Sequence, residues 1–159
     1  MATTLIVMLA VLLSNAWLWL GRPMVQTVHR CRIAQEADIA LAYLTSDLGG
    51  CPAESYAGYK LAGQFVGWTA PGNGEFLLCF DSTDNPNGLA DWGAPDQVIM
   101  YQLVGNALVR WNQTNGNETV VAQNVESLIA ETSGDTLELI LTFACQGITQ
   151  TYTLVAQRP

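Results

Sequence analysis

Hydrophobic residues dominate the first 21 positions, which carry no charged side chain, and between Leu5 and Leu20 only Ser14 and Asn15 interrupt the apolar run. As a helix over residues 4–21, this segment would be about 27 Å long at about 1.5 Å per residue, close to the roughly 30 Å of a bilayer's hydrocarbon core. No Lys or Arg precedes the run, and no small-residue cleavage site follows it. The pattern favours a retained membrane helix over a cleaved signal peptide or the buried helix of a soluble protein.

A second helical pattern follows, from about residue 23 to Leu48. Its apolar residues form one stripe about 100° wide when projected on a helix; they are Ile33, Ala37, Ala40, Leu41, Leu44 and Leu48. The residues outside the stripe are polar, namely Arg32, Gln35, Glu36, Ser46 and Asp47. Gly49 and Gly50 stop the helix, and Pro52 prevents its continuation. We therefore expect one helix over about 4–48, continuous or kinked once near Pro23, whose second part buries this stripe.

The remaining residues, 49–159, have a β-rich pattern. Runs of β-branched and aromatic residues predict strands at 75–80, 97–104, 107–111, 120–122, 125–130, 136–143 and 148–156. Short turn sequences at 105–106, 133–135 and 146–147 join consecutive strands at hairpin spacing. The predicted fold class is α+β: a membrane helix (1–22) and an amphipathic stalk helix (23–48) packed on an antiparallel β-sheet head (49–159), whose strands form one meander.

Three stretches in this layout carry a family resemblance. Residues 39–48 (IALAYLTSDL) end the stalk in a leucine-rich stretch with an Asp-Leu pair, residues 101–110 (YQLVGNALVR) form a Tyr-x-Leu…Leu-x-Arg hairpin, and residues 121–125 (VAQNV) follow it. In this order, behind a hydrophobic N-terminal helix, they resemble type IV pilin-like proteins. The specific match is to W-type minor pilins and J-type minor pseudopilins of type II secretion, and it covers essentially the whole chain.

The resemblance implies a structural subunit of a type IV pilus-like filament or a type II secretion pseudopilus. Its partners would be other pilin-like subunits and the inner membrane. Assembly would run through the N-terminal helix, with Leu5, Ile6, Val7, Leu9, Val11, Leu12 and Pro23 as the assembly residues.

The chain departs from the family pattern at its N-terminus. Where pilins have Thr-Leu-Ile-Glu, this chain has Thr-Leu-Ile-Val at 4–7, with neither a basic leader nor the preceding glycine. In the family, that glutamate is thought to neutralise the N-terminal amine of the neighbouring subunit, which would otherwise be an unpaired charge in lipid. A tip subunit has no neighbour ahead of it, so Val7 favours a tip or priming role. Met1 is either a mature start or the initiator of a chain that is not cleaved.

Charge is distributed unevenly along the chain. Residues 1–60 hold four basic and four acidic side chains, while 61–159 hold two basic and ten acidic ones, so the net charge of −8 lies in the head. Such a head repels nucleic acid, which we do not expect as a partner. Arg22, Arg30 and Arg32 follow the apolar segment and would, by the positive-inside rule, place the head in the cytoplasm. The cysteines and the resemblance favour the opposite topology, with an extracytoplasmic head.

The four cysteines, Cys31, Cys51, Cys79 and Cys145, allow three complete pairings. A helix that persists to Leu48 would hold Cys31 and Cys51 about 25 Å or more apart, beyond the roughly 7 Å reach of a disulfide. We favour a Cys51–Cys79 bridge, which would tie the end of the stalk to the first long strand. Ordinary buried thiols are the alternative, and Cys31 lies off the apolar stripe, where it is unpaired or faces another subunit.

The candidate chemistry is sparse. The loop 81–96 collects hard oxygen donors of the kind that calcium prefers, namely Asp81, Asp84, Asn87 and Asp91. It lacks the alternation and the closing glutamate of an EF-hand, and Asx turns explain the same residues. We therefore expect no cofactor, with calcium as the one candidate. The only histidine, His29, has no Ser or Cys nucleophile in a nearby turn, so we expect no enzyme. A single-pass anchored binding module with an acidic head remains the alternative function.

Overall fold

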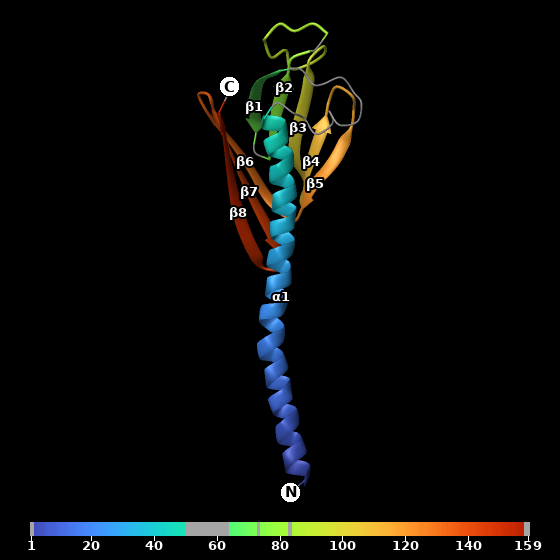
Figure 1. Cartoon of the computed structure of the whole chain (residues 1–159), viewed down its shortest axis with the longest axis vertical. Coiled ribbons are helices and arrows are strands. Elements are labelled where there is room, and N and C mark those ends of the chain that lie inside the picture. Colours follow the sequence, from blue (N-terminus) through green and yellow to red (C-terminus); the bar gives the residue numbers. More distant parts are fainter. Residues whose placement is uncertain (1, 50–63, 73, 83, 158–159) are drawn as a thin grey trace.

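The structure, a computed structural model, describes residues 2–49, 64–72, 74–82 and 84–157; the side chains of residues 2–5, 20 and 22 lie outside that description. Within these ranges the chain forms one long helix, α1 (Ala2–Leu48), and a head of β-strands. Figure 1 shows the N-terminal part of α1 projecting from the head as a rod, while its C-terminal part lies against the strands. The predicted apolar segment and stalk are thus one helix, and the boundary expected at residue 22 falls inside it.

Pro23 lies inside α1 without ending it. A proline in a helix interior removes one backbone donor and crowds the preceding turn. Thr27 Oγ1 donates a hydrogen bond of 2.8 Å to the carbonyl of Pro23, and Ser14 Oγ donates one of 2.8 Å to the carbonyl of Ala10. Both hydroxyls are therefore satisfied within the helix, which lets Ser14 lie in an apolar segment without needing water.

The strands form two antiparallel sheets rather than the single meander that we expected. Sheet A has five strands in sequential order: β1 (Phe65–Gly72), β2 (Glu75–Phe80), β3 (Gln97–Val104), β4 (Ala107–Asn112) and β5 (Glu118–Gln123). Sheet B has three: β6 (Val125–Ser133), β7 (Thr136–Cys145) and β8 (Ile148–Gln157). The chain changes sheets at Asn124, whose φ of 59° is a conformation that asparagine tolerates better than most residues.

The expected strands are present, and β1 is an additional strand that the pattern did not predict. Gly67, Pro71 and Gly72 lie within β1 and hide it, because glycine and proline are depleted in strands. The position of β1 at the edge of sheet A explains its composition, since a proline inside a sheet is tolerated mainly on edge strands and at bulges. Its pairing with β2 is indeed irregular at two places.

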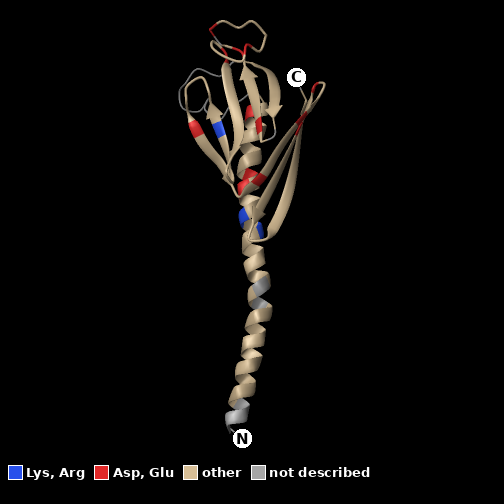
Figure 2. Ribbon diagram, turned by 180° about the vertical axis from the view of Figure 1, so that it is seen from behind, with Lys and Arg blue, Asp and Glu red and all other residues tan. Residues whose placement is uncertain are grey.

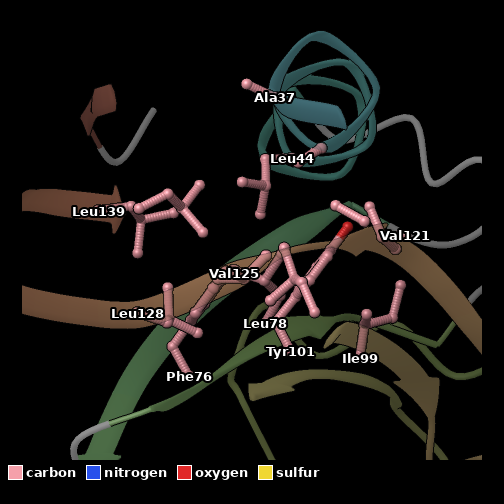
Figure 3. Packing of buried hydrophobic residues seen from close by; sticks show 14 of the residues in the cluster. Ala37, Leu44, Phe76, Leu78, Ile99, Tyr101, Val121, Val125, Leu128 and Leu139 are labelled. Carbon is pink, nitrogen blue, oxygen red and sulfur yellow. The ribbon is translucent and has the colours of Figure 1, made fainter. Parts of the chain in front are cut away.

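The core lies between the two sheets and the C-terminal part of α1. Ile33, Ala37, Ala40 and Leu44 are all 0 % exposed, and Leu41 and Leu48 are half-buried, which confirms the predicted stripe. Figure 3 shows Ala37 and Leu44 of α1 above the core side chains of both sheets. Burial of these apolar side chains is the main favourable term that holds the helix to the head.

Candidate functional site

The N-terminal part of α1 exposes its apolar side chains. Of the expected assembly residues, Ile6, Val7, Leu9, Val11 and Leu12 are between 54 % and 67 % exposed, and Pro23 is exposed as well; the side chain of Leu5 lies outside the described part. Trp17 and Trp19 are even more exposed, and an open apolar hollow runs along the helix from Trp17 to His29. A contiguous apolar surface of this kind marks a site that lipid or protein covers.

In the described chain, α1 is the one helix that is long and apolar enough to cross a membrane. None of its apolar window is buried inside the molecule, whereas the core helix of a soluble protein would be mostly buried. In the ribbon of Figure 2, no acidic or basic residue is coloured on the described N-terminal part of the helix, and several acidic residues are coloured on the head. Length, composition and exposure together suggest a single-pass membrane anchor.

A buried ionic cluster fastens the other end of α1 to sheet A. Asp47, one residue before the helix ends, is 0 % exposed, and its Oδ2 accepts hydrogen bonds from Tyr101 Oη at 2.6 Å and from Arg110 Nε at 2.7 Å. Arg110 Nη2 reaches the second carboxylate oxygen at 3.3 Å. Tyr101 on β3 and Arg110 on β4 are cross-strand partners, so the sheet presents both donors side by side to the helix.

The cluster combines an electrostatic cost, that of burying the Asp47 carboxylate, with an ion pair that offsets this cost. A carboxylate in the last turn of a helix is disfavoured by the helix dipole, and burial adds a desolvation cost. Arg110, which is 1 % exposed, offsets both through its charge and its paired donors. Burial, and then the Asp47 carboxylate, raise the pKa of Tyr101 well above its ordinary value, so its hydroxyl stays a donor. The cluster adds directional bonds to non-directional packing and thereby fixes α1 against β3 and β4.

The helical projection misplaced Asp47. It counted this residue among the polar positions outside the stripe, whereas the structure buries it completely. The projection treats a charged residue as solvent-facing and carries no information about a partner 63 positions away. The signal that could have revealed the cluster was in the resemblance, because Asp47, Tyr101 and Arg110 all belong to the motifs quoted for it.

The cysteines differ from the favoured prediction. Cys31, Cys79 and Cys145 are free thiols, so the Cys51–Cys79 bridge is not formed at Cys79; Cys51 itself lies outside the described residues. Cys79 Sγ instead donates to Asp96 Oδ2 at 3.4 Å. Burial, above all, raises the pKa of Cys79 to about 11, so this thiol is protonated at neutral pH. The alternative of ordinary buried thiols fits Cys79 and Cys145, and Cys31 is exposed, as its position off the stripe predicted.

The carboxylates of loop 81–96 hold the loop's own backbone. Asp81 is 4 % exposed, and its Oδ2 accepts from the N–H groups of Asn87 at 3.1 Å and Gly88 at 2.7 Å. Asp96 is 0 % exposed and accepts from the N–H groups of Ser82 and Asp91 at 3.1 Å and 3.0 Å. These bonds satisfy backbone donors that the loop leaves without strand partners.

The calcium prediction gains no support from this arrangement. Of its four residues, Asp81 is engaged with backbone, the N–H of Asp84 donates to Ser82 Oγ, and Asn87 Nδ2 donates to Asp91 Oδ2 at 2.9 Å. Across the described ranges, no three His, Cys, Asp or Glu side chains come together as a metal cage. The turn explanation accounts for the residues without a metal.

His29 has a neighbour that the sequence did not reveal. Its Nδ1 lies 3.6 Å from Sγ of Cys145, at the end of β7, contrary to the expectation that no cysteine would be near. Cys145 is only 9 % exposed, and no acidic side chain of the described chain completes the pair to a group of three. The contact joins α1 to the β7–β8 turn at the base of the head.

Comparison of this chain with protein-family models, with curated proteins and with solved structures found no match. Two features of the chain itself bear on its function: α1 is divided into an exposed and a packed part, and the ionic cluster fixes the packed part.

Proposed function

We propose that this chain is a structural subunit of a type IV pilus-like filament or a type II secretion pseudopilus, and that it assembles through the N-terminal part of α1. The observation that carries the proposal is the division of one continuous helix. Four stripe residues of the packed part, among them Leu44, are 0 % exposed in the head's core, whereas Leu12 is 66 % exposed in the projecting part. A subunit built in this way leaves half of its helix for neighbouring helices to cover.

The chemistry of the projecting part suits helix packing in lipid. Ala10, Ser14 and Ala16 are small residues that let neighbouring helices approach closely. Ser14 is satisfied by the carbonyl of Ala10, so it adds no unpaired polar group to such an interface. Bundling with other helices also explains why Pro23 is tolerated, because neighbouring helices can satisfy the carbonyl group that its missing N–H leaves free.

The subunit we propose is a minor component at the tip of the filament or in its priming complex. Val7, where the family resemblance leads us to expect a glutamate, offers no carboxylate to a neighbour's N-terminal amine. A bulk subunit without that carboxylate would leave a charge unpaired at every step of the filament. A subunit at the tip has no such step ahead of it.

The topology in this proposal has the chain anchored in the inner membrane before assembly, with the head extracytoplasmic. Because Cys79 and Cys145 are free thiols, they give no support to an extracytoplasmic head. The support for this topology is the family resemblance. Cys31 tests the topology directly, because it is exposed just outside the apolar segment. A membrane-impermeant maleimide should label Cys31 in intact spheroplasts; labelling only after lysis would reverse the topology.

Cross-linking tests the assembly proposal. A Leu12→Cys variant, in a chain that carries Cys31→Ser, places one thiol in the middle of the exposed apolar surface. In native membranes that contain the companion pilin-like subunits, a maleimide-linked benzophenone coupled to this thiol should, on illumination, insert into a C–H bond of a neighbouring pilin-like subunit and yield a covalent product. A matched Ile39→Cys variant, exposed on the packed part of α1, should yield few. Monomer alone from Leu12→Cys would contradict assembly through this surface.

The alternative is a single-pass anchored binding module. Its supporting observation is the loop 81–96, which Asp81 and Asp96 hold in a defined shape at the end of the head far from the N-terminus (Figure 1). The cross-linking experiment separates the two functions, because a binding module needs no neighbouring helix and would remain monomeric in the membrane.

A further inference from the structure

The edge strands of the two sheets differ in how they are protected. An open strand edge presents unpaired N–H and C=O groups to any passing chain, and proteins usually protect it with bulges, prolines, charges or a covering element. Strand β1 carries Pro71 and irregular pairing, and it packs against β6. In β5, the N–H of Gln123 donates to Glu36 of α1 at 2.8 Å. The carbonyl of Leu128 in β6 accepts from Gly74, and the N–H of Val125 donates to Asn106.

Strand β8 contacts α1, and its inward-facing side chains pack on the core. Among the described residues, however, its outer edge shows no bulge, proline, charge or backbone hydrogen bond. Its ten residues, ITQTYTLVAQ, include no charge and no proline, and each pairs with β7 in unbroken register. No backbone hydrogen bond joins its outer edge to another described residue. Figure 1 shows β8 as the outermost strand of sheet B, running along the head from its base toward the C-terminus.

The geometry of the β7–β8 turn identifies which backbone N–H and C=O groups of β8 point away from β7. Gln146 and Gly147 both have positive φ, 50° and 77°, as a two-residue type I′ turn requires. In such a hairpin the pair that flanks the turn, Cys145 and Ile148, is hydrogen-bonded, and bonded pairs alternate from there. The β8 residues that lie between successive bonded pairs direct their N–H and C=O groups outward, away from β7; these are Thr149, Thr151, Thr153, Val155 and Gln157.

We propose that β8 is a docking edge, to which an extended, uncharged segment of a second, different protein adds as a further antiparallel strand. Main-chain hydrogen bonds to the outward groups provide the affinity, as in other cases of strand addition. The outward residues also place their side chains on the exposed face of sheet B, where Thr149, Thr151, Thr153 and Val155 suit a partner rich in threonine and valine.

A second copy of this chain does not fit the edge; this step alone rests on the proposed function. If two copies paired through β8 as antiparallel strands, a two-fold axis perpendicular to the strands would relate them. Their two α1 helices would then run in opposite directions, and so would their apolar ends. Copies anchored in one membrane must have parallel helices. In that orientation a copy could offer only its other edges, and β1, β5 and β6 are engaged by its own elements.

Amide hydrogen exchange tests the edge in the full chain, held in lipid nanodiscs. In the chain alone, the amides of Thr149, Thr151, Thr153 and Val155 should exchange quickly, and those of Gln150, Tyr152 and Leu154 slowly. Adding a blocked nine-residue peptide of alternating threonine and valine should protect the first set. Outward amides that are already protected without peptide, or that stay unprotected with it, would overturn the proposal.

A backbone substitution sharpens the test. Thr153→Pro removes one outward N–H but no bond to β7, because proline is tolerated where the N–H faces away from the ladder. It should weaken peptide binding about tenfold or more, whereas Thr153→Val keeps the N–H and should bind normally. Equal binding to both variants would contradict strand addition. A dimer of the full chain that Thr153→Pro dissociates would contradict a different protein as the partner. Peptide binding does not depend on helix assembly, so this proposal and the proposed function can fail separately.

Discussion

The two parts of α1 share one backbone conformation and differ in what surrounds them. From Ile33 onward, the helix buries a stripe of small and branched residues against two sheets and ends in an ionic cluster. Before Pro23, the described side chains expose apolar surface on every side, with no charge among them. The packed part is stabilised by the chain's own head, whereas the exposed part requires surroundings that the chain does not supply. Helical structure alone therefore says little about function; the distribution of partners along the helix says more.

The largest expected difference between the two parts concerns charge. Leu12→Arg places a guanidinium near the middle of the apolar segment, where insertion into the membrane costs about 2.5–3.5 kcal/mol. Ile39→Arg puts the same group on the packed part, at a side chain that is 49 % exposed. Leu12→Arg should reduce the membrane fraction about 100-fold, measured by carbonate extraction, and Ile39→Arg should not. Similar losses for both variants would remove the distinction between the two parts.

Breaking the ionic cluster should affect only the head. Asp47→Ala leaves Arg110 buried without its carboxylate, and loss of one member of a buried pair typically costs about 3–5 kcal/mol. The free energy of unfolding, from urea titration of the chain in detergent, should fall by that amount. Asp38→Ala removes an exposed carboxylate from the same helix and should change it by less than about 0.5 kcal/mol. A small effect at Asp47 would mean that the cluster is not buried as described.

Truncating a leucine in each part compares packing directly. Leu44→Ala leaves a cavity between α1 and the sheets and should lower the free energy of unfolding by about 2–5 kcal/mol. Leu12→Ala removes the same atoms from a side chain that is 66 % exposed and should leave head stability unchanged. Equal losses would show that the projecting part packs on the head in solution.

The smallest expected effect is at alkaline pH and concerns the head alone. Folding raises the pKa of Cys79 from 9.0 to about 11, so the folded state holds this proton more tightly than the unfolded state. The corresponding stability is present in full below pH 9 and declines as the pH rises from 9 to 11. Tyr101, whose pKa is also raised, adds to the decline above pH 10. Urea midpoints between pH 8 and 10 should fall for the native chain and less for Cys79→Ala; parallel curves would contradict the assignment.

Local patterns predicted the long helix, its buried stripe and most strands, because each depends on the spacing of residues near one another in the chain. The division into two sheets was missed, since it depends on one residue, Asn124, and on packing between distant strands. The cluster of Asp47 with Arg110 and the contact of His29 with Cys145 were missed for the same reason. Strand β1 was missed because its glycines and proline resemble a loop until its place at a sheet edge is known.

We propose that assembly belongs to the projecting helix and that the head alone does not assemble. Residues 25–159 retain the packed part of α1, the ionic cluster and both sheets, and they carry every charged side chain of the chain except Arg22. Sedimentation and light scattering of this fragment should show a soluble monomer, with circular dichroism of an intact sheet, while the full chain should require lipid or partner subunits. Filaments or tight oligomers formed by the fragment alone would show that the head assembles without the projecting helix.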